Sequence, residues 1–146
     1  MTISARPLSC DPSAIGGFSV FAWVKGGAPI QVVLSQESGA DWLLADPAEG
    51  KLMTGLKSSG RFGTPLFSEA VIIDGEWHRI GLVRDGSNRT LYVDDVEVAK
   101  DTQAGLAASQ GGLYLGAGRT PEPGKLGSFW SGLIDDVRIY DRAVTP

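Results

Sequence analysis

The chain has 146 residues, 42% of them hydrophobic, and a formal net charge of −4. This length and composition predict one ordinary domain, residues 1–146, with a core that needs no disulfide or metal. A net negative charge does not favour binding to a phosphate backbone, so nucleic acid is not an expected partner. No apolar run approaches the roughly 20 residues that span a bilayer, so membrane insertion is not expected either.

The 20 glycines and 8 prolines are typical of many short strands joined by tight turns. The single cysteine, Cys10, excludes an internal disulfide. We interpret it as a small buried residue of the first strand, with a reactive thiol or a bond to another chain as alternatives. Residues 1–7 lack the apolar stretch of a signal peptide, which leaves either a cytosolic protein or a segment of a longer precursor.

Period-2 alternation, rather than helical periodicity, runs along the chain. Residues 18–24 are apolar on both faces, which predicts a central strand covered on both sides. Further strands are expected, in order, over residues 30–34, 41–45, 51–56, 70–73, 77–84, 89–93, 96–99, 113–115 and 129–140, with turns at Asp74-Gly75, Asp85-Gly86 and Asp94-Asp95 and loops over 57–65 and 116–128. Residues 101–109 are the one helical candidate. About ten strands at this spacing predict an all-β sandwich or barrel.

Four aromatic residues in the strand patterns, Phe18, Phe21, Trp23 and Trp77, are predicted to fill the space between two sheets. The one histidine, His78, follows Trp77 at a strand start and is interpreted as a structural, hydrogen-bonded residue rather than a base. One histidine and one cysteine cannot supply a zinc site.

Five segments, in this order and spacing, carry a family resemblance: FSVFAWVK, DGEWHRIGLVRDG, RTLYVDDVEVA, GGLYLGAG and FWSGLIDDVRIYDRAVTP. From Phe18 to Pro146 the chain resembles the LamG-like jelly-roll family of the concanavalin A-like lectin/glucanase superfamily. The resemblance implies a jelly-roll sandwich of two antiparallel sheets. It also implies an extracellular or cell-surface setting and an accessory role beside other domains of a larger exported bacterial protein.

Two features depart from the family pattern. Members usually begin with an additional stretch that carries FDG or LDGVDDY, and only residues 7–12 remain of it here, so an edge strand is missing or is supplied by residues 3–8. The hairpin that usually turns on Asp-Gly reads Asp94-Asp95. A type I′ turn needs positive φ at both positions, which Asp tolerates less well than Gly, so this turn is expected to be strained or of another type.

The superfamily includes glucanases, so the resemblance also implies a catalytic alternative. Those enzymes use an E-x-D-x-E type array, and retaining glycosidases need two carboxylates about 5–5.5 Å apart. The chain has no such run: the cluster Asp94, Asp95 and Glu97 spans a predicted turn, and the adjacent Asp135 and Asp136 are expected on opposite sheet faces. No catalytic residue is therefore assigned.

Asp135 is expected on a core-facing row with Leu133 and Val137, where a carboxylate needs partners. We expect it to cap backbone N–H groups of a neighbouring loop, with calcium coordination as the alternative. Many members of the resembled family carry calcium, but some of the ligands come from the N-terminal stretch that this chain lacks. No full ligand set can be named, and no other cofactor is expected.

Sugars are held by a flat aromatic face and a few fixed polar groups. The first candidate is Trp42 beside Asp41, the second is Trp130 beside Phe129, and Arg61 and Arg119 are candidate loop donors. The alternative is that both tryptophans are core or sheet-face residues.

The leading hypothesis is a non-catalytic module that recognises a glycan or a protein surface through its loops or a sheet face. A purely structural spacer domain and a glycan-active hydrolase are the alternatives. The sequence assigns neither a ligand nor an oligomeric state.

Overall fold

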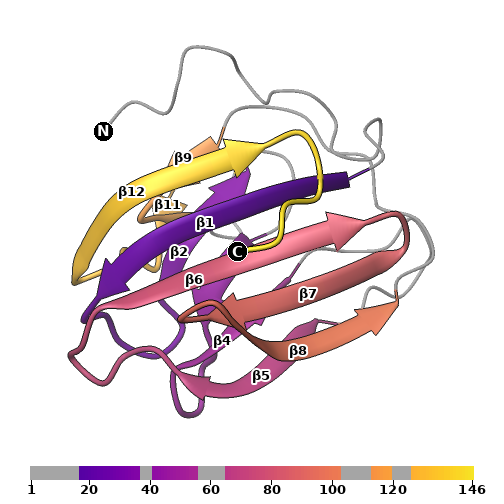
Figure 1. The fold of residues 1–146 in the computed structure, drawn as a ribbon. Helices are drawn as coiled ribbons and strands as arrows, with labels where there is room; N and C mark the ends of the chain where they lie inside the picture. The colour runs from indigo at the N-terminus through magenta and orange to yellow at the C-terminus, as the bar shows by residue number, and fades with distance from the viewer. Residues whose placement is uncertain (1–16, 37–40, 56–64, 103–112, 120–125) are drawn as a thin grey trace.

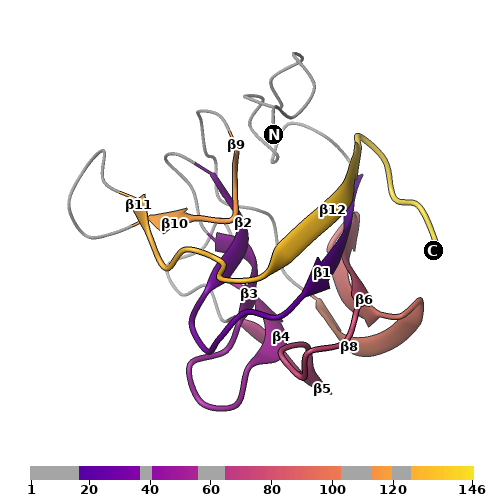
Figure 2. The same ribbon diagram turned by 90° about the vertical axis from the view of Figure 1, so that its left-hand side faces the viewer.

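The computed structural model describes residues 17–36, 41–55, 65–102, 113–119 and 126–146. They form two five-stranded antiparallel sheets that stack as the layers of a sandwich (Figure 1, Figure 2). The fold is all-β and consistent with the jelly roll that the sequence predicts. No helix among these residues is long and apolar enough to cross a membrane.

The first sheet has the order β12-β1-β6-β7-β8. Its strands are β1 (Gly17–Lys25), β6 (His78–Asp85), β7 (Asn88–Val93), β8 (Val96–Thr102) and β12 (Leu133–Tyr140). The apolar strand β1 lies between β12 and β6, as its two apolar faces predict. The β7–β8 hairpin is also where the sequence places it, although β8 continues to Thr102, into the segment given as a helical candidate.

The second sheet has the order β5-β4-β3-β2-β9. Its strands are β2 (Val32–Gln36), β3 (Asp41–Ala45), β4 (Lys51–Thr54), β5 (Leu66–Val71) and β9 (Leu113–Leu115). The predicted strand 70–73 is too late, because β5 already begins at Leu66. The predicted loop 116–128 contains a short hairpin of β10 (Gly118–Arg119) and β11 (Leu126–Gly127).

The core fills the space between the two sheets. Phe18 of β1 and Trp42 of β3 meet there, with ring centroids 5.0 Å apart and both side chains buried. Aliphatic side chains from both layers pack around them, including Val20, Leu34, Leu43, Leu52, Ile80, Leu82 and Leu91. At one side of the sandwich β5 lies next to β8, and at the other the edge strands β9 and β12 border a groove.

A β-bulge in β12 decides which of its side chains face the core. Phe21 of β1 pairs with Arg138, but Trp23 pairs with Asp135. Between these two pairs β1 advances by two residues and β12 by three. The additional residue is accommodated at Asp136, whose φ is 46°. Beyond the bulge the inward positions change, and Ile134 and Val137 both pack against the core. The core-facing row predicted for Leu133 and Asp135 is therefore wrong, because both side chains are exposed.

The sequence predicts that the Asp94-Asp95 turn is either strained or of a type other than I′, and the structure shows the strained form. Both residues have positive φ, 54° and 65°, which is the conformation that a type I′ turn requires. The Asp94 carboxylate accepts the backbone N–H of Arg79 at 3.1 Å, and the Asp95 carboxylate pairs with the Arg79 guanidinium at 2.5 Å. These contacts fasten the tip of the hairpin to the start of β6.

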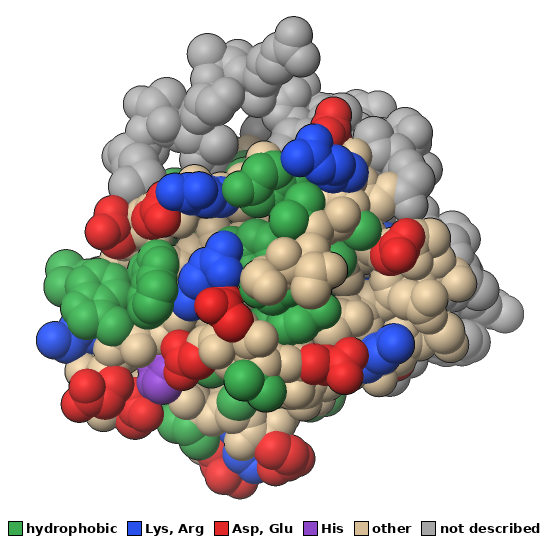
Figure 3. Space-filling model, in the orientation of Figure 1, with side chains coloured by type: hydrophobic (Ala, Val, Ile, Leu, Met, Phe, Trp, Pro, Cys, Tyr) green, Lys and Arg blue, Asp and Glu red, His purple; other side chains and the backbone are tan. Residues whose placement is uncertain are grey.

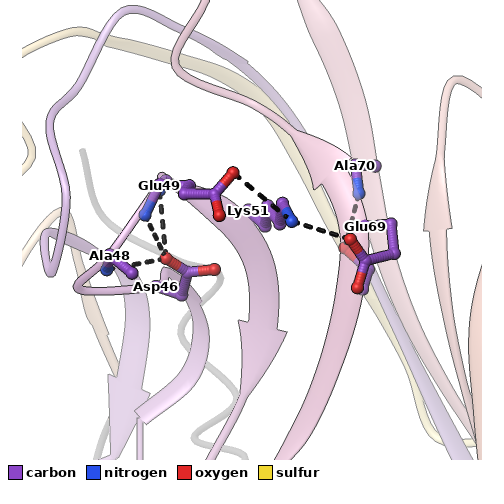
Figure 4. Close-up of polar contacts among 8 residues, drawn as sticks. Asp46, Ala48, Glu49, Lys51, Glu69 and Ala70 are labelled. Carbon is purple, nitrogen blue, oxygen red and sulfur yellow. Dashed lines mark hydrogen bonds and ion pairs between the residues drawn. The ribbon is translucent and has the colours of Figure 1, made fainter.

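Asp46 holds the turn between β3 and β4, as Figure 4 shows. Its Oδ1 accepts the backbone N–H groups of Ala48 at 2.9 Å, Glu49 at 2.7 Å and Gly50 at 3.1 Å. Burial alone would raise the pKa of Asp46, but these N–H groups outweigh it and hold the pKa below its usual value. Next to the turn, Lys51 reaches across to Glu69 of β5 at 2.7 Å.

Replacing Asp46 with alanine is expected to lower the free energy of unfolding by about 1–3 kcal/mol, since three backbone donors lose their acceptor. Because the folded-state pKa is depressed, the contribution of the charged carboxylate is present above the unfolded pKa of about 3.9. It is lost as the pH falls through the folded-state pKa. Urea denaturation of wild type and Asp46→Asn should therefore give a stability gap at neutral pH that closes in acid. A gap independent of pH would show that the charge plays no part.

Candidate functional site

Trp42 is a core residue, which corrects its assignment as a sugar platform. Its side chain is 2% exposed and packs on Phe18, so no indole face is open to a ligand. The reason is an irregular register between β2 and β3, in which Trp42 and the adjacent Leu43 both point into the core. Asp41 does not join it, because its Oδ1 lies on the other side of β3, where it would be 3.4 Å from a Cβ placed on Gly118.

Trp130 is also mostly buried, at 8% exposed. Its ring lies over Gly27, where a Cβ would collide with the indole, and its Nε1 donates to the Leu133 carbonyl at 3.3 Å. It does border the groove between the sheet edges, a cavity of about 430 Å³. That volume suits a small ligand. The groove is lined by Leu113, Tyr114, Leu115, Ala117, Leu126, Trp130, Gly132 and Ile134.

Arg61, Cys10 and residues 103–109 lie outside the described residues. Arg119 belongs to β10, where its backbone pairs with Leu126 of β11. The structure therefore places Asp41 and Trp130 near the β10–β11 hairpin, to which Arg119 belongs.

The exposed tryptophans are instead Trp23 and Trp77, which corrects their assignment to the core. They are 37% and 41% exposed. Trp23 of β1 pairs with Arg79 of β6. Trp77 directly precedes β6, and continuing the same register by one residue places it opposite Lys25 of β1. Alternate residues share a face, so both indoles lie on the outer face of the first sheet. Leu133, which pairs with Lys25 and is also exposed, completes a surface that we call the tryptophan face: Trp23, Trp77 and Leu133.

Figure 3 looks onto this side of the molecule and shows hydrophobic side chains gathered over the end of β1 and the start of β12, bordered by acidic and basic groups. In the register of the sheet, two polar residues flank Trp23 directly, Arg79 on β6 and Asp135 on β12. Arg79 is held in place, because its guanidinium pairs with Asp95 and its Cζ lies 4.6 Å from the centroid of the Phe21 ring. The two indoles of the tryptophan face are thus bordered by a fixed cation, Arg79, and a carboxylate, Asp135.

His78 lies next to Trp77 in the chain, and its side chain is hydrogen-bonded, as the sequence predicts. Its Nδ1 is 2.8 Å from Asp94 Oδ2, and its Nε2 is 2.8 Å from Asp74 Oδ1. Burial alone would lower the pKa of His78, but the hydrogen bonds with Asp94 and Asp74 outweigh it and raise the pKa.

Asp135 caps a backbone N–H group, but that of its own neighbour rather than of another loop: its Oδ1 accepts from Asp136 at 2.8 Å. Asp136 pairs with Arg138 at 3.0 Å. Among the residues that the structure describes, no three His, Cys, Asp or Glu side chains are placed to hold a metal ion. Calcium coordination by Asp135 stays the alternative to backbone capping.

The solved structures that share the fold include the following three. A putative carbohydrate binding protein from Bacteroides ovatus has a TM-score of 0.70 at 16% identity, over 95% of this chain and 40% of its own. Domain 4 of AbnA, an extracellular arabinanase from Geobacillus stearothermophilus, was solved in complex with arabinotriose. It has a TM-score of 0.51 at 21% identity, over 92% of this chain and 66% of its own. The binding domain of botulinum neurotoxin DC in complex with SialylT has a TM-score of 0.61 at 10% identity, over 90% of this chain and 34% of its own.

This chain therefore spans about two thirds or less of each of these structures, and identities this low establish the fold alone. No curated protein matches the sequence at a significant level. The family model Laminin_G_3, described as the concanavalin A-like lectin/glucanases superfamily, matches residues 5–146, which is nearly the whole chain. The chain therefore belongs to the Laminin_G_3 family of the concanavalin A-like lectin/glucanase superfamily.

Proposed function

We propose that the chain is a non-catalytic carbohydrate-binding module and that the tryptophan face is its sugar-binding surface. The observation that carries this proposal is the placement of two exposed indoles, Trp23 and Trp77, on one face of the first sheet. An indole plane stacks on the apolar face of a pyranose ring, while Arg79 and Asp135 are positioned to hydrogen-bond its hydroxyl groups.

Two further observations support a binding role without catalysis. Similar structures include a putative carbohydrate binding protein and a domain in complex with arabinotriose. The clustered carboxylates Asp94 and Asp95 are engaged by His78 and Arg79, in contacts that hold the hairpin turn. By this proposal the module belongs to a larger exported protein and serves it outside the cell.

A protein surface is the second candidate partner, because exposed tryptophan beside arginine is also the composition of protein-binding hot spots. The two candidates differ in one measurable respect. A sugar-binding face gives reproducible hits on a glycan array, whereas a protein-docking face or a structural spacer gives none.

The test has two stages. The purified domain is first screened on a glycan array, and the strongest hit is then titrated by calorimetry against Trp23→Ala and Trp77→Ala. Each variant is expected to bind at least about tenfold more weakly, which corresponds to about 1.4 kcal/mol per factor of ten. The control is Phe67→Ala, because Phe67 is 54% exposed but lies on β5 in the other sheet. An array without hits, or tryptophan variants that bind like Phe67→Ala, would contradict the proposal.

A further inference from the structure

The ring of His78 is held between two carboxylates that come from different parts of the chain. Asp74 belongs to the loop between β5 and β6, and Asp94 to the turn between β7 and β8. A carboxylate at neutral pH only accepts hydrogen bonds, and a neutral imidazole carries only one N–H group. Both 2.8 Å contacts can therefore be hydrogen bonds only when both ring nitrogens are protonated.

We propose that His78 is a pH-dependent clasp beside the tryptophan face: the imidazolium bridges Asp74 and Asp94 and closes the chain segment 74–78, which contains Trp77, and loss of one proton opens one bridge and loosens that segment. As a regulator of sugar binding, this clasp rests on the proposed function. As a device that closes segment 74–78, it stands on the two His78 contacts alone.

The two sides of the clasp are not equally secured. On the hairpin side, backbone contacts reinforce it: Arg79 N–H donates to the Asp94 carboxylate at 3.1 Å, and Asp94 N–H donates to the Arg79 carbonyl at 2.8 Å. On the loop side, Asp74 Oδ1 also accepts the N–H of Glu76 at 3.0 Å, but that bond stays within the loop. The bridge through His78 Nε2 joins the loop to the first residue of β6, and Trp77 lies in the short chain segment between the two.

The charged groups around His78 favour the bridged form. Asp74 comes from its own loop and Asp94 from the hairpin turn, and the acidic residues Glu76 and Asp95 lie close to them in the chain. Arg79, the cation on β6, is paired with Asp95. These contacts agree with a pKa of His78 that lies above the ordinary value of about 6.5. A folded-state pKa that is raised makes the contribution of the clasp complete below the unfolded pKa, and it is lost as the pH rises through the folded-state pKa.

The chain has one histidine, so its ring can be followed without ambiguity by nitrogen-detected NMR. We expect two protonated ring nitrogens at neutral pH and a titration midpoint above that of a free histidine. The indole N–H signal of Trp77 should shift with the same midpoint in wild type and lose this dependence in His78→Gln. Asp74→Asn, which removes the loop-side carboxylate, should loosen Trp77 at all pH values. A Trp77 signal that ignores the titration of His78 would overturn the clasp.

Binding measurements then separate the clasp from the proposed function. If a glycan binds, its affinity for wild type should fall by about fivefold as His78 loses its proton, the scale of one net hydrogen bond, and stay flat in His78→Gln. Equal pH profiles in both proteins would overturn the regulatory role and leave sugar binding intact. If no glycan binds, the proposed function fails, and the shared midpoint of His78 and Trp77 still decides whether the clasp exists.

Discussion

Replacing Trp42 with alanine is expected to lower the free energy of unfolding by about 3–5 kcal/mol, because it empties a large volume between the sheets. Trp42 is 2% exposed and contacts Phe18 of the opposite layer. A loss of this size is a large share of the roughly 5–15 kcal/mol that stabilises a typical domain. Equilibrium denaturation in urea would measure it.

Trp77→Ala is the matched control, since it removes the same side chain from a surface where the indole is 41% exposed. We expect it to cost less than about 1 kcal/mol. Trp42→Phe refines the comparison, because Trp42 Nε1 is buried with no hydrogen-bond partner among the described residues. Phenylalanine keeps most of the ring and removes that donor, so its cost should fall well below that of alanine. Equal losses for Trp42→Ala and Trp77→Ala would contradict this assignment of core and surface.

Replacing Asp101 with asparagine is expected to cost about 2–3 kcal/mol, because it takes a counter-charge from a buried arginine. Arg89 is 2% exposed and forms a two-pronged pair with Asp101, at 2.7 Å from Nε and 2.9 Å from Nη2. Arg84, which is also buried, lies opposite Arg89 in the register of β6 and β7. Burial and the positive charge of Arg89 both lower the pKa of Arg84. The Asp101 side chain is 34% exposed, so solvent reduces the effect below that of a fully buried pair.

The control for this prediction is Asp136→Asn. Asp136 pairs with Arg138 at 3.0 Å, but both side chains are about half exposed, and exposed pairs contribute about 0–1 kcal/mol. Thermal and urea denaturation of both variants at low and high salt would compare them. The larger loss should belong to Asp101→Asn and change little with salt. If the two variants lose the same stability, the buried arginine is not held by Asp101.

The fold could be predicted from the sequence because its signal is repeated along the chain. Strand β1 reads as apolar on both faces, and Phe21 is indeed buried on the outer face, beneath Arg79. The same pattern could not show where that cover ends, and two positions further along β1 Trp23 is exposed. Periodicity predicts that a residue belongs to a strand, but it does not tell which of two apolar faces is covered.

The candidate site was predicted less well because bulges reverse the face of a side chain. One additional residue at Asp136 turns Leu133 and Asp135 outward, and an irregular register beside β3 turns Trp42 inward. A linear pattern does not show such shifts. The partners of His78 are easier to predict from the sequence. The hairpin predicted around Asp85-Gly86 places residue 78 opposite the Asp94-Asp95 turn, and that register indicates a carboxylate partner.

The most direct test of the account uses the indole N–H signals of the four tryptophans in a proton–nitrogen NMR spectrum. A glycan identified on the array is titrated into labelled protein, and each signal is assigned by single substitution to phenylalanine. Binding at the tryptophan face should shift the signals of Trp23 and Trp77 together, with one dissociation constant, and leave those of Trp42 and Trp130 in place. Shifts confined to Trp130 would move the site to the groove between β9 and β12, and would contradict the account.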